Sequence, residues 1–293
     1  MMSKMDFENF IETAWNDHAD QPEVVAVRLQ ESLAEITESE RIAPYARLVT
    51  HVFGEHLARW SDGIALLESI RHCSGWDDAG SDAATLGRNI AVLDYCAGNL
   101  TALSGLSGED RVAVLATASS ALAGQGDYTR AINAFQQAEQ AFDAGWLATS
   151  PAIRALAVNG NNLAVALEEK SVRDAFESQG MVAAAVAGLK YWTLAGTWLQ
   201  QERAEYRLAK SLLKADRRAE AVDHAQRCVA ICVAHEATPF EHFFAYAVLA
   251  IAQRAARDID AYQLSREQAL RFYQRIPVDE QVWCAVDLTE LNG

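Results

Sequence analysis

Apolar residues recur at helical spacing along almost the whole chain, and this periodicity constrains the fold more than any other feature of the sequence. We find no convincing segment in which apolar and polar residues alternate with the period of two that a half-buried strand requires. Residues that favour strands are diluted by Ala, Glu, Gln and Arg, which favour helices. The pattern therefore predicts an all-α protein.

The predicted helices are long, and the segments that join them are short. Short links between long helices predict antiparallel helix pairs. The clearest loop is SGWDDAGSD at 74–82, which is small, acidic and contains Gly. We place the helices near residues 5–18, 22–38, 41–59, 62–73, 83–104, 109–124, 128–143, 151–169, 172–191, 193–214, 217–235, 239–256, 258–275 and 279–290.

Three of these helices carry a recognisable start signal. Ser150 and Thr238 each precede a Pro, and a Pro at the first helical position loses no hydrogen bond. Their hydroxyl groups are expected to cap the helices that follow. Asp127 precedes YTRAINAFQQAEQAF and is expected to cap that helix through its carboxylate.

The composition limits the classes of function. The net charge of −15 disfavours a duplex nucleic-acid binder, which needs a broad basic surface, and disfavours contact with an anionic membrane. No apolar run approaches the ~18 residues of a membrane span, and the acidic N-terminal region does not resemble a secretory signal. The 5 Cys include no CxxC pair and are typical of reduced thiols. We therefore expect a cytoplasmic protein without nucleic-acid or membrane partners.

One helix pair has a recognisable small-residue pattern. In LATASSALAGQGDYTRAINAFQQAEQAF, Gly126-Asp127-Tyr128 lies at the turn, and Ala131, Phe135 and Ala138 lie on the second helix. The small residues allow the two helices to approach each other, and the aromatic ring fills the space beside them. This segment resembles a tetratricopeptide repeat.

Weaker copies of the pattern occur later in the chain. In RLAKSLLKADRRAEAVDHAQRCV, the corresponding places are taken by Ala221, Ala225 and Cys228, and in AYAVLAIAQRAARDIDAYQLSREQAL Ala261 corresponds to Ala131. Ala131 and Ala221 are 90 residues apart, and Ala221 and Ala261 are 40 apart. These periods exceed the ~34 residues of the standard repeat and resemble the longer variants of kinesin light chains.

The resemblance implies a right-handed superhelical solenoid of antiparallel helix pairs. In such a fold no pair buries its apolar stripe alone, so each pair needs its neighbours and the ends need capping. We expect capping helices in residues 1–40, a repeat array in residues 41–275 and a C-terminal capping helix in residues 276–293.

A basic stripe marks the predicted helix 193–214. Arg203, Arg207, Lys210 and Lys214 are spaced four, three and four apart, which places them on one helix face. Alignment on Ala221 makes this the first helix of a pair, and the resemblance implies that first helices line a concave groove. Arg and Lys suit the recognition of carboxylates or phosphates.

A solvated face is the alternative interpretation of this basic stripe, and charge stripes are more often of that kind. The neighbouring Glu202, Glu205 and Glu220 would then be the local ion-pair partners, each contributing little to stability.

The resemblance adds four more residues to the expected groove. Asn161-Asn162-Leu163-Ala164 resembles the start of a kinesin-light-chain-type repeat, which implies that Asn161 and Asn162 lie near the groove. Their amides are able to hold the backbone of an extended peptide. A hydrogen bond at a helix end or between helices is an equal alternative for these amides. Tyr206 and Tyr246 would supply apolar contact in the groove.

The stretch HAQRCVAICVAH combines two residue types that bind metals. His224, Cys228, Cys232 and His235 fall on one helix face. The two His residues are roughly 16 Å apart along a helix, so one ion cannot touch all four. Buried packing of the two Cys residues is the favoured interpretation, because free Cys behaves as a small hydrophobe. We expect no metal site and no cofactor.

Together these patterns predict a protein-binding or peptide-binding helical-repeat scaffold that recognises an acidic segment or a chain terminus. The alternative is a ligand-sensing or peptide-sensing module of a bacterial regulatory system. An enzyme comes third, because the sequence contains no GxSxG, P-loop, HExxH or strand-linked GxGxxG motif. The sequence leaves a homodimer open.

Overall fold

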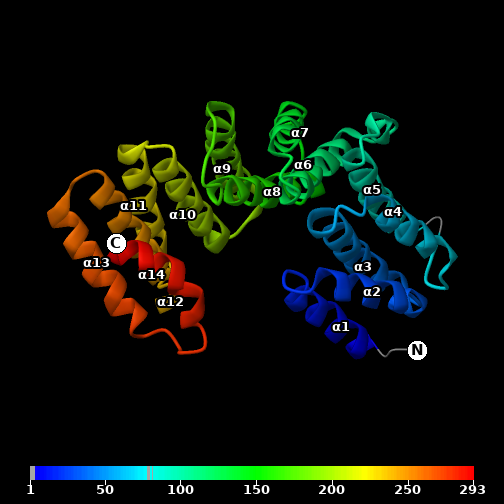
Figure 1. Ribbon diagram of the computed structural model, residues 1–293, viewed down its shortest axis with the longest axis horizontal. Helices are drawn as coiled ribbons and strands as arrows, with labels where there is room; N and C mark the ends of the chain where they lie inside the picture. Colours follow the sequence, from blue (N-terminus) through cyan, green and yellow to red (C-terminus); the bar gives the residue numbers. More distant parts are fainter. Residues whose placement is uncertain (1–3, 78–79, 81) are drawn as a thin grey trace. The chain divides into compact units, whose positions relative to one another are not determined.

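The computed structural model describes residues 4–77, 80 and 82–293 (Figure 1). Every regular element within these ranges is a helix, which confirms the all-α prediction. The chain divides into two compact units. The first comprises residues 1–146 and 150–156, and the second comprises residues 147–149 and 157–293. The division falls inside the segment 41–275 that the sequence suggests is one repeat array.

The core of the first unit surrounds the fully buried rings of Tyr45 and Phe53. Its α-helices are α1 (Lys4–Asp17), α2 (Pro22–Ser32), α3 (Ile42–Val49), α4 (Trp60–Ser69), α5 (Asp82–Cys96), α6 (Gly108–Gly124), α7 (Tyr128–Gln140) and the start of α8 (Pro151–Glu168). Shorter elements are the 3-10 helices η1 (Leu33–Glu35), η2 (Ser39–Arg41), η4 (Ile70–His72) and η5 (Leu100–Leu103), and the π-helix η3 (Thr50–His56).

In the second unit, successive helices from α9 to α13 pack against one another. The apolar core of this unit includes Phe243, Ala247 and Leu291. The unit contains the rest of α8, followed by α9 (Ala175–Ala195), α10 (Trp198–Lys214), α11 (Arg218–Ala234), α12 (Pro239–Ala255), α13 (Ile259–Tyr273), the 3-10 helix η6 (Gln281–Cys284) and α14 (Ala285–Asn292).

The capping predictions are confirmed. The Asp127 carboxylate accepts a hydrogen bond from the backbone N–H of Arg130. The hydroxyls of Ser150 and Thr238 accept from the first turns of α8 and α12 in the same way. Each cap satisfies a donor that the helix itself leaves without a partner.

Several predicted boundaries differ from the structure by more than two residues, and two of them have a clear local cause. The predicted helix 83–104 already ends at Cys96, because Gly98 has a φ of 104° and the Asn99 side chain caps η5. The predicted break near residue 192 occurs instead at Gly196, where Thr197 and Gln200 form a capping box that starts α10. In both cases local hydrogen bonding decides a boundary that apolar periodicity does not resolve.

One turn geometry recurs between successive helices. Gly126, Asp216 and Arg257, which follow α6, α10 and α12, have φ values of 76°, 59° and 66°. In each case the next N–H bonds back to a carbonyl five residues earlier, which is the hydrogen bond of a Schellman motif. The three bonds run from Asp127 to Leu122 at 3.0 Å, from Arg217 to Leu212 at 2.9 Å and from Asp258 to Gln253 at 2.9 Å.

None of the helices in the described part of the chain combines the length and the apolar character that a membrane span requires.

Candidate binding site around helix α10

Helix α10 carries the basic stripe and packs against α9, α11 and α12. Its buried residues include Ala204, Leu208 and Leu212, which join the core, and also the charged Glu202 and Lys210. Burying a charge is costly unless that charge is paired and hydrogen-bonded. The function of this face of α10 therefore depends on which residues pair with its charges.

Arg203 pairs with Glu241 at the start of α12. The guanidinium donates to both carboxylate oxygens, one of them at 3.4 Å from Nε. Such two-pronged contacts are stronger and more specific than single ones. Glu241 is buried, whereas 56% of the Arg203 side chain is exposed, so this pair lies at the rim of the site.

Arg207 pairs with Glu168 at the end of α8. Its guanidinium donates to one oxygen of this buried carboxylate, and the hydroxyl of Ser211 donates to the other. Burial raises the pKa of Glu168, while the Arg207 cation and the Ser211 hydroxyl oppose that rise. This pair connects α8 to α10 within the second unit.

Lys210 is the most buried cation of the stripe, with only 8% of its side chain exposed. Its ammonium lies 3.4 Å from Oδ1 of Asp287 and also donates to Glu290. The Tyr206 hydroxyl donates to the same Asp287 oxygen at 2.6 Å. Burial raises the pKa of Tyr206 well above its usual value, and the Asp287 carboxylate adds to that shift. Both acidic residues belong to α14.

Helix α14 is also held by backbone contacts at its C-terminal end. Arg254 of α12 donates to the carbonyl of Glu290 at 2.7 Å, and Tyr262 of α13 donates to that of Leu291 at 3.0 Å. A cation near the last carbonyls of a helix also stabilises the helix dipole. The face of α10 with Tyr206 and Lys210 therefore already holds a short acidic helix of the same chain.

The remaining predicted residues lie in different environments. Lys214 is exposed and forms no ion pair with any residue in the described ranges. Asn162 is exposed, whereas Oδ1 of Asn161 is buried against Gly188 of α9 and meets no donor among the described residues. The Tyr246 ring stacks on Phe272 at 5.7 Å and thus faces α13. Of the predicted site residues, the structure brings Arg207 and Lys210 over the Tyr206 ring, at 5.7 and 5.9 Å from its centroid.

Four carboxylates of this site were not predicted from the sequence as partners of the basic stripe. The partners of the basic stripe are Glu168, Glu241, Asp287 and Glu290, which lie 38 to 80 residues away along the chain. Among the local partners expected for a solvated face, Glu220 pairs with the nearby Arg217, whereas Glu205 contacts His224 and Glu202 contacts two Cys residues. No sequence signal identifies pairs this distant, since their approach depends on helix packing.

Glu202 contacts the two Cys residues of HAQRCVAICVAH. Cys228 and Cys232 are fully buried, as expected for packing residues, and their Sγ atoms lie 2.8 and 3.5 Å from Oε1 of Glu202. Burial raises the pKa of Glu202 to about 7, a shift that the Cys228 hydrogen bond opposes and the nearby Glu241 carboxylate reinforces. Burial also raises the pKa of both thiols, which makes them poor nucleophiles.

The two His residues of the same stretch contact different side chains. Nδ1 of His224 lies 2.5 Å from a Glu205 oxygen, and the His235 ring stacks on Trp198 with 4.8 Å between ring centroids. The four side chains of HAQRCVAICVAH therefore do not converge on one point.

No model of a known protein family matches this chain, and no curated protein matches it closely enough to count as a relative.

Proposed function

We propose that the second unit binds an acidic segment of a partner protein on the face of α10 that carries Tyr206 and Lys210. One observation carries this proposal: the same face holds α14, a separate helix, through its acidic residues Asp287 and Glu290. A partner segment with similarly spaced carboxylates would take the place of α14. The chain's own C-terminal helix is then an internal competitor of the partner.

A helical-repeat architecture is part of the same proposal. The recurring turn after α6, α10 and α12 and the packing of successive helices are compatible with a right-handed solenoid of antiparallel pairs. In such a fold α10 is a first helix, which gives its side chains the position of a groove wall. The resemblance to tetratricopeptide repeats supports this assignment.

Exposed cations lie at both ends of the α10 stripe. Arg203 is more than half exposed, and Lys214 is exposed one turn beyond Lys210. Long-range attraction to these cations would speed the approach of an acidic segment. The net negative charge of the whole protein acts in the opposite direction and repels such a segment. A partner longer than α14 gains these two contacts in addition to those that α14 makes.

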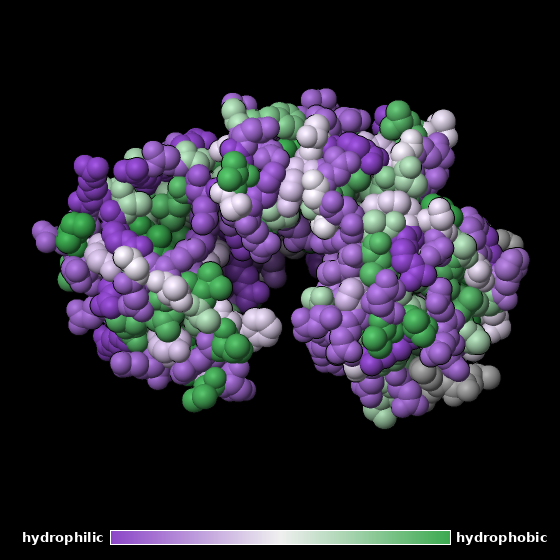
Figure 2. Space-filling model, viewed as in Figure 1, coloured by the Kyte–Doolittle hydropathy of each residue, from purple (hydrophilic) through white to green (hydrophobic). Residues whose placement is uncertain are grey.

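The C-terminal segment also exposes apolar side chains. Val278, Val282, Trp283 and Val286 are between 67% and 83% exposed. Most of the surface visible in Figure 2 is hydrophilic, with smaller hydrophobic patches between. Exposed Trp residues are typical of sites where proteins contact each other. Their position beside the acidic residues of α14 supports the proposal that this segment is replaced by a segment of a partner protein.

A labelled peptide tests the proposal in the full chain. The probe is a fluorescent peptide of residues 279–293 carrying Cys284→Ser, and its binding is followed by anisotropy. The chain variant Asp287→Asn/Glu290→Gln weakens the internal competitor. We expect this variant to bind the peptide at least about tenfold more tightly than the unmodified chain, since its binding face is more often free.

The matched control is the same peptide with Asp287→Asn and Glu290→Gln. We expect this control peptide to bind at least about tenfold more weakly than the acidic one, because it lacks the charges that meet Lys210. Equal affinity of the two peptides, or no saturable binding to either chain, would contradict the proposed function.

A further inference from the structure

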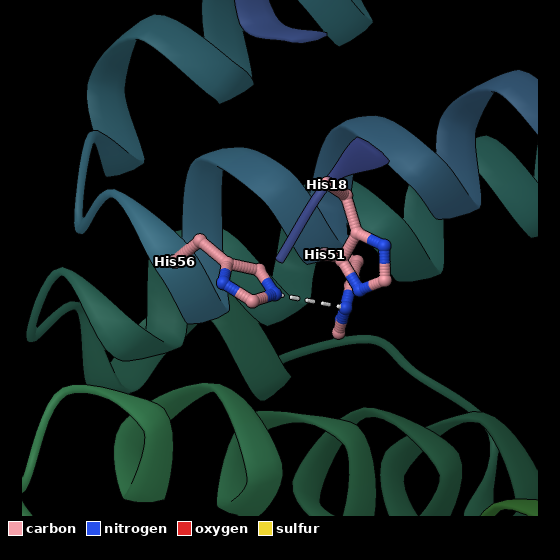
Figure 3. A group of neighbouring side chains, drawn as sticks. All are labelled: His18, His51 and His56. Carbon is pink, nitrogen blue, oxygen red and sulfur yellow. Dashed lines mark hydrogen bonds between the residues drawn. The ribbon is translucent and has the colours of Figure 1, made fainter. Parts of the chain in front are cut away.

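Three His residues converge in the first unit (Figure 3). His18 follows α1, and His51 and His56 belong to the π-helix η3. Their ring centroids form a nearly equilateral triangle with sides of 4.7, 4.8 and 4.9 Å. In the part of the chain that the structure describes, this is the one group of three or more His, Cys, Asp or Glu residues whose ligand atoms lie within 4.8 Å of one another.

The π-helix brings two of these rings to the same side. In an α-helix, side chains five residues apart point about 140° away from each other. A π-helix forms hydrogen bonds from residue i to residue i+5, so residues five apart lie close to one full turn apart. The bond from the Leu57 N–H to the Val52 carbonyl, at 3.1 Å, has this spacing. His51 and His56 therefore face each other, with their Nε2 atoms 3.2 Å apart.

Hydrogen bonds to Nδ1 orient two of the rings. Nδ1 of His18 lies 2.5 Å from the Trp15 carbonyl, and Nδ1 of His51 lies 3.0 Å from a Glu55 carboxylate oxygen. With Nδ1 as the donor in both rings, each Nε2 carries a lone pair and is the ligand nitrogen, and the Nε2 of His51 accepts a hydrogen bond from His56. Metal-binding His residues are oriented in this way by a carbonyl or carboxylate on the opposite ring nitrogen.

Glu55 is itself fixed by the neighbouring helix α6. Nε2 of Gln125 donates to the Glu55 carbonyl at 2.7 Å. Gly124 permits this approach, because a Cβ atom there would lie 2.6 Å from both the Cγ and the carbonyl oxygen of Glu55. The carboxylate that orients His51 thus belongs to a packed part of the first unit.

The spacing of two of the three ligand nitrogens fits a tetrahedral ion. At Zn–N distances of about 2.0–2.1 Å, two ligands of a tetrahedral site lie about 3.3 Å apart. The separation of 3.2 Å between the Nε2 atoms of His51 and His56 is close to this value. The His51 side chain is 22% exposed, so an ion can reach the group from solvent. Imidazole ligands favour ions such as zinc over magnesium or calcium.

We propose that His18, His51 and His56 bind one divalent transition-metal ion of the zinc type, with Glu55 as a positioning residue for His51. Three imidazoles leave the fourth tetrahedral position to water or to a group from solvent. The site lies in the first unit and involves none of the residues of the proposed peptide-binding face. Its test is therefore independent of the test of the proposed function.

Zinc titration of the chelator-treated protein tests this site. A chromophoric chelator competes for the zinc and reports the affinity, and the metal content of the protein is measured separately. We expect one zinc ion per chain. His18→Gln, His51→Gln and His56→Gln should each weaken binding at least tenfold, and Glu55→Gln should weaken it about tenfold or more. His72→Gln is the matched control, because His72 is exposed in the same unit, and it should bind zinc like the unmodified chain.

Cobalt provides a second measurement that needs no variant. We expect one equivalent of Co²⁺ to give the intense visible absorption of a tetrahedral site, and one equivalent of Zn²⁺ to remove it. Circular dichroism shows whether each His variant is folded, and a variant that does not fold leaves the cobalt titration as the deciding test. The absence of stoichiometric zinc and cobalt binding would overturn the proposal. So would one bound zinc whose affinity is unchanged in folded His18→Gln, His51→Gln and His56→Gln variants.

Discussion

The Tyr206 hydroxyl donates a 2.6 Å hydrogen bond to Asp287, which lies 81 residues further along the chain. This bond joins the middle of α10 to α14, and the Lys210 ammonium lies 3.4 Å from the same Asp287 oxygen. An acidic helix is thus held on a basic face by the contacts that a partner segment would use. The stability of the second unit and the proposed peptide binding consequently depend on the same side chains.

The first prediction concerns Asp287→Asn. The substitution keeps the shape of the side chain but removes the negative charge beside Lys210, which is buried. We expect a loss of about 1–3 kcal/mol in the free energy of unfolding, measured by urea denaturation. Asp279→Asn, at an exposed position in the same segment, should change it by no more than about 0.5 kcal/mol. Equal effects of the two substitutions would show that Asp287 does not hold α14.

The second prediction is a double-mutant cycle on Arg207 and Glu168. Arg207→Leu leaves a buried carboxylate without its cation and should cost about 3–5 kcal/mol of unfolding free energy. Arg207→Leu/Glu168→Leu removes both charges and should cost less than Arg207→Leu alone. Purely additive effects of the two single substitutions, measured by denaturation, would argue against a coupled buried pair.

The third prediction concerns Glu202 and pH. The folded chain raises the Glu202 pKa from 4.5 to about 7 and so holds this proton more tightly than the unfolded chain. The resulting stabilisation is fully present below pH 4.5 and is lost as the pH rises through 7. Glu202→Gln does not titrate, so its stability relative to the unmodified chain should increase by about 3 kcal/mol between pH 4.5 and pH 8.

Denaturation at a series of pH values measures this difference between the two chains. Glu267→Gln, at an exposed position on α13, is the control and should give a profile parallel to that of the unmodified chain. A profile for Glu202→Gln that also runs parallel would contradict the raised pKa of Glu202.

The fourth prediction concerns the close approach of α8 and α9. A Cβ atom at Gly160 would lie 2.8 Å from the Ala184 carbonyl and 2.9 Å from the Gly188 nitrogen. We expect Gly160→Ala to cost about 1–3 kcal/mol of unfolding free energy, because the two backbones have to move apart. Gly87→Ala is the matched control. Apart from the chain neighbours and the nearby backbone of its own helix, no atom of the described residues lies within 4 Å of a Cβ at this position, which should gain up to about 1 kcal/mol.

Apolar periodicity and capping residues predict most of the helices. The start of α6 at Gly108 and that of α12 at Pro239 lie within one residue of the expected positions. Both depend on local signals, namely a side chain that caps the helix and an apolar stripe that follows. The burial of Cys228 and Cys232 was also predictable, because their spacing places them on the packed face of α11.

The partners of the charged residues could not be predicted in the same way. Asp287 reaches Tyr206 only because α14 packs against α12 and α12 against α10. The His group of the first unit depends on an irregular local structure. His51 and His56 are five residues apart, a spacing that in an α-helix places them on different faces, and only the π-helix brings them together.

Hydrogen exchange of α14 in the unmodified chain tests the central claim most directly. The acidic peptide of residues 279–293, carrying Cys284→Ser, is added at increasing concentration, and exchange of the amides in residues 285–292 is followed by mass spectrometry. If the peptide takes the place of α14 on Tyr206 and Lys210, these amides should exchange faster as the peptide saturates. Unchanged protection of α14 at peptide concentrations that saturate binding would show that the peptide binds elsewhere and would contradict the claim.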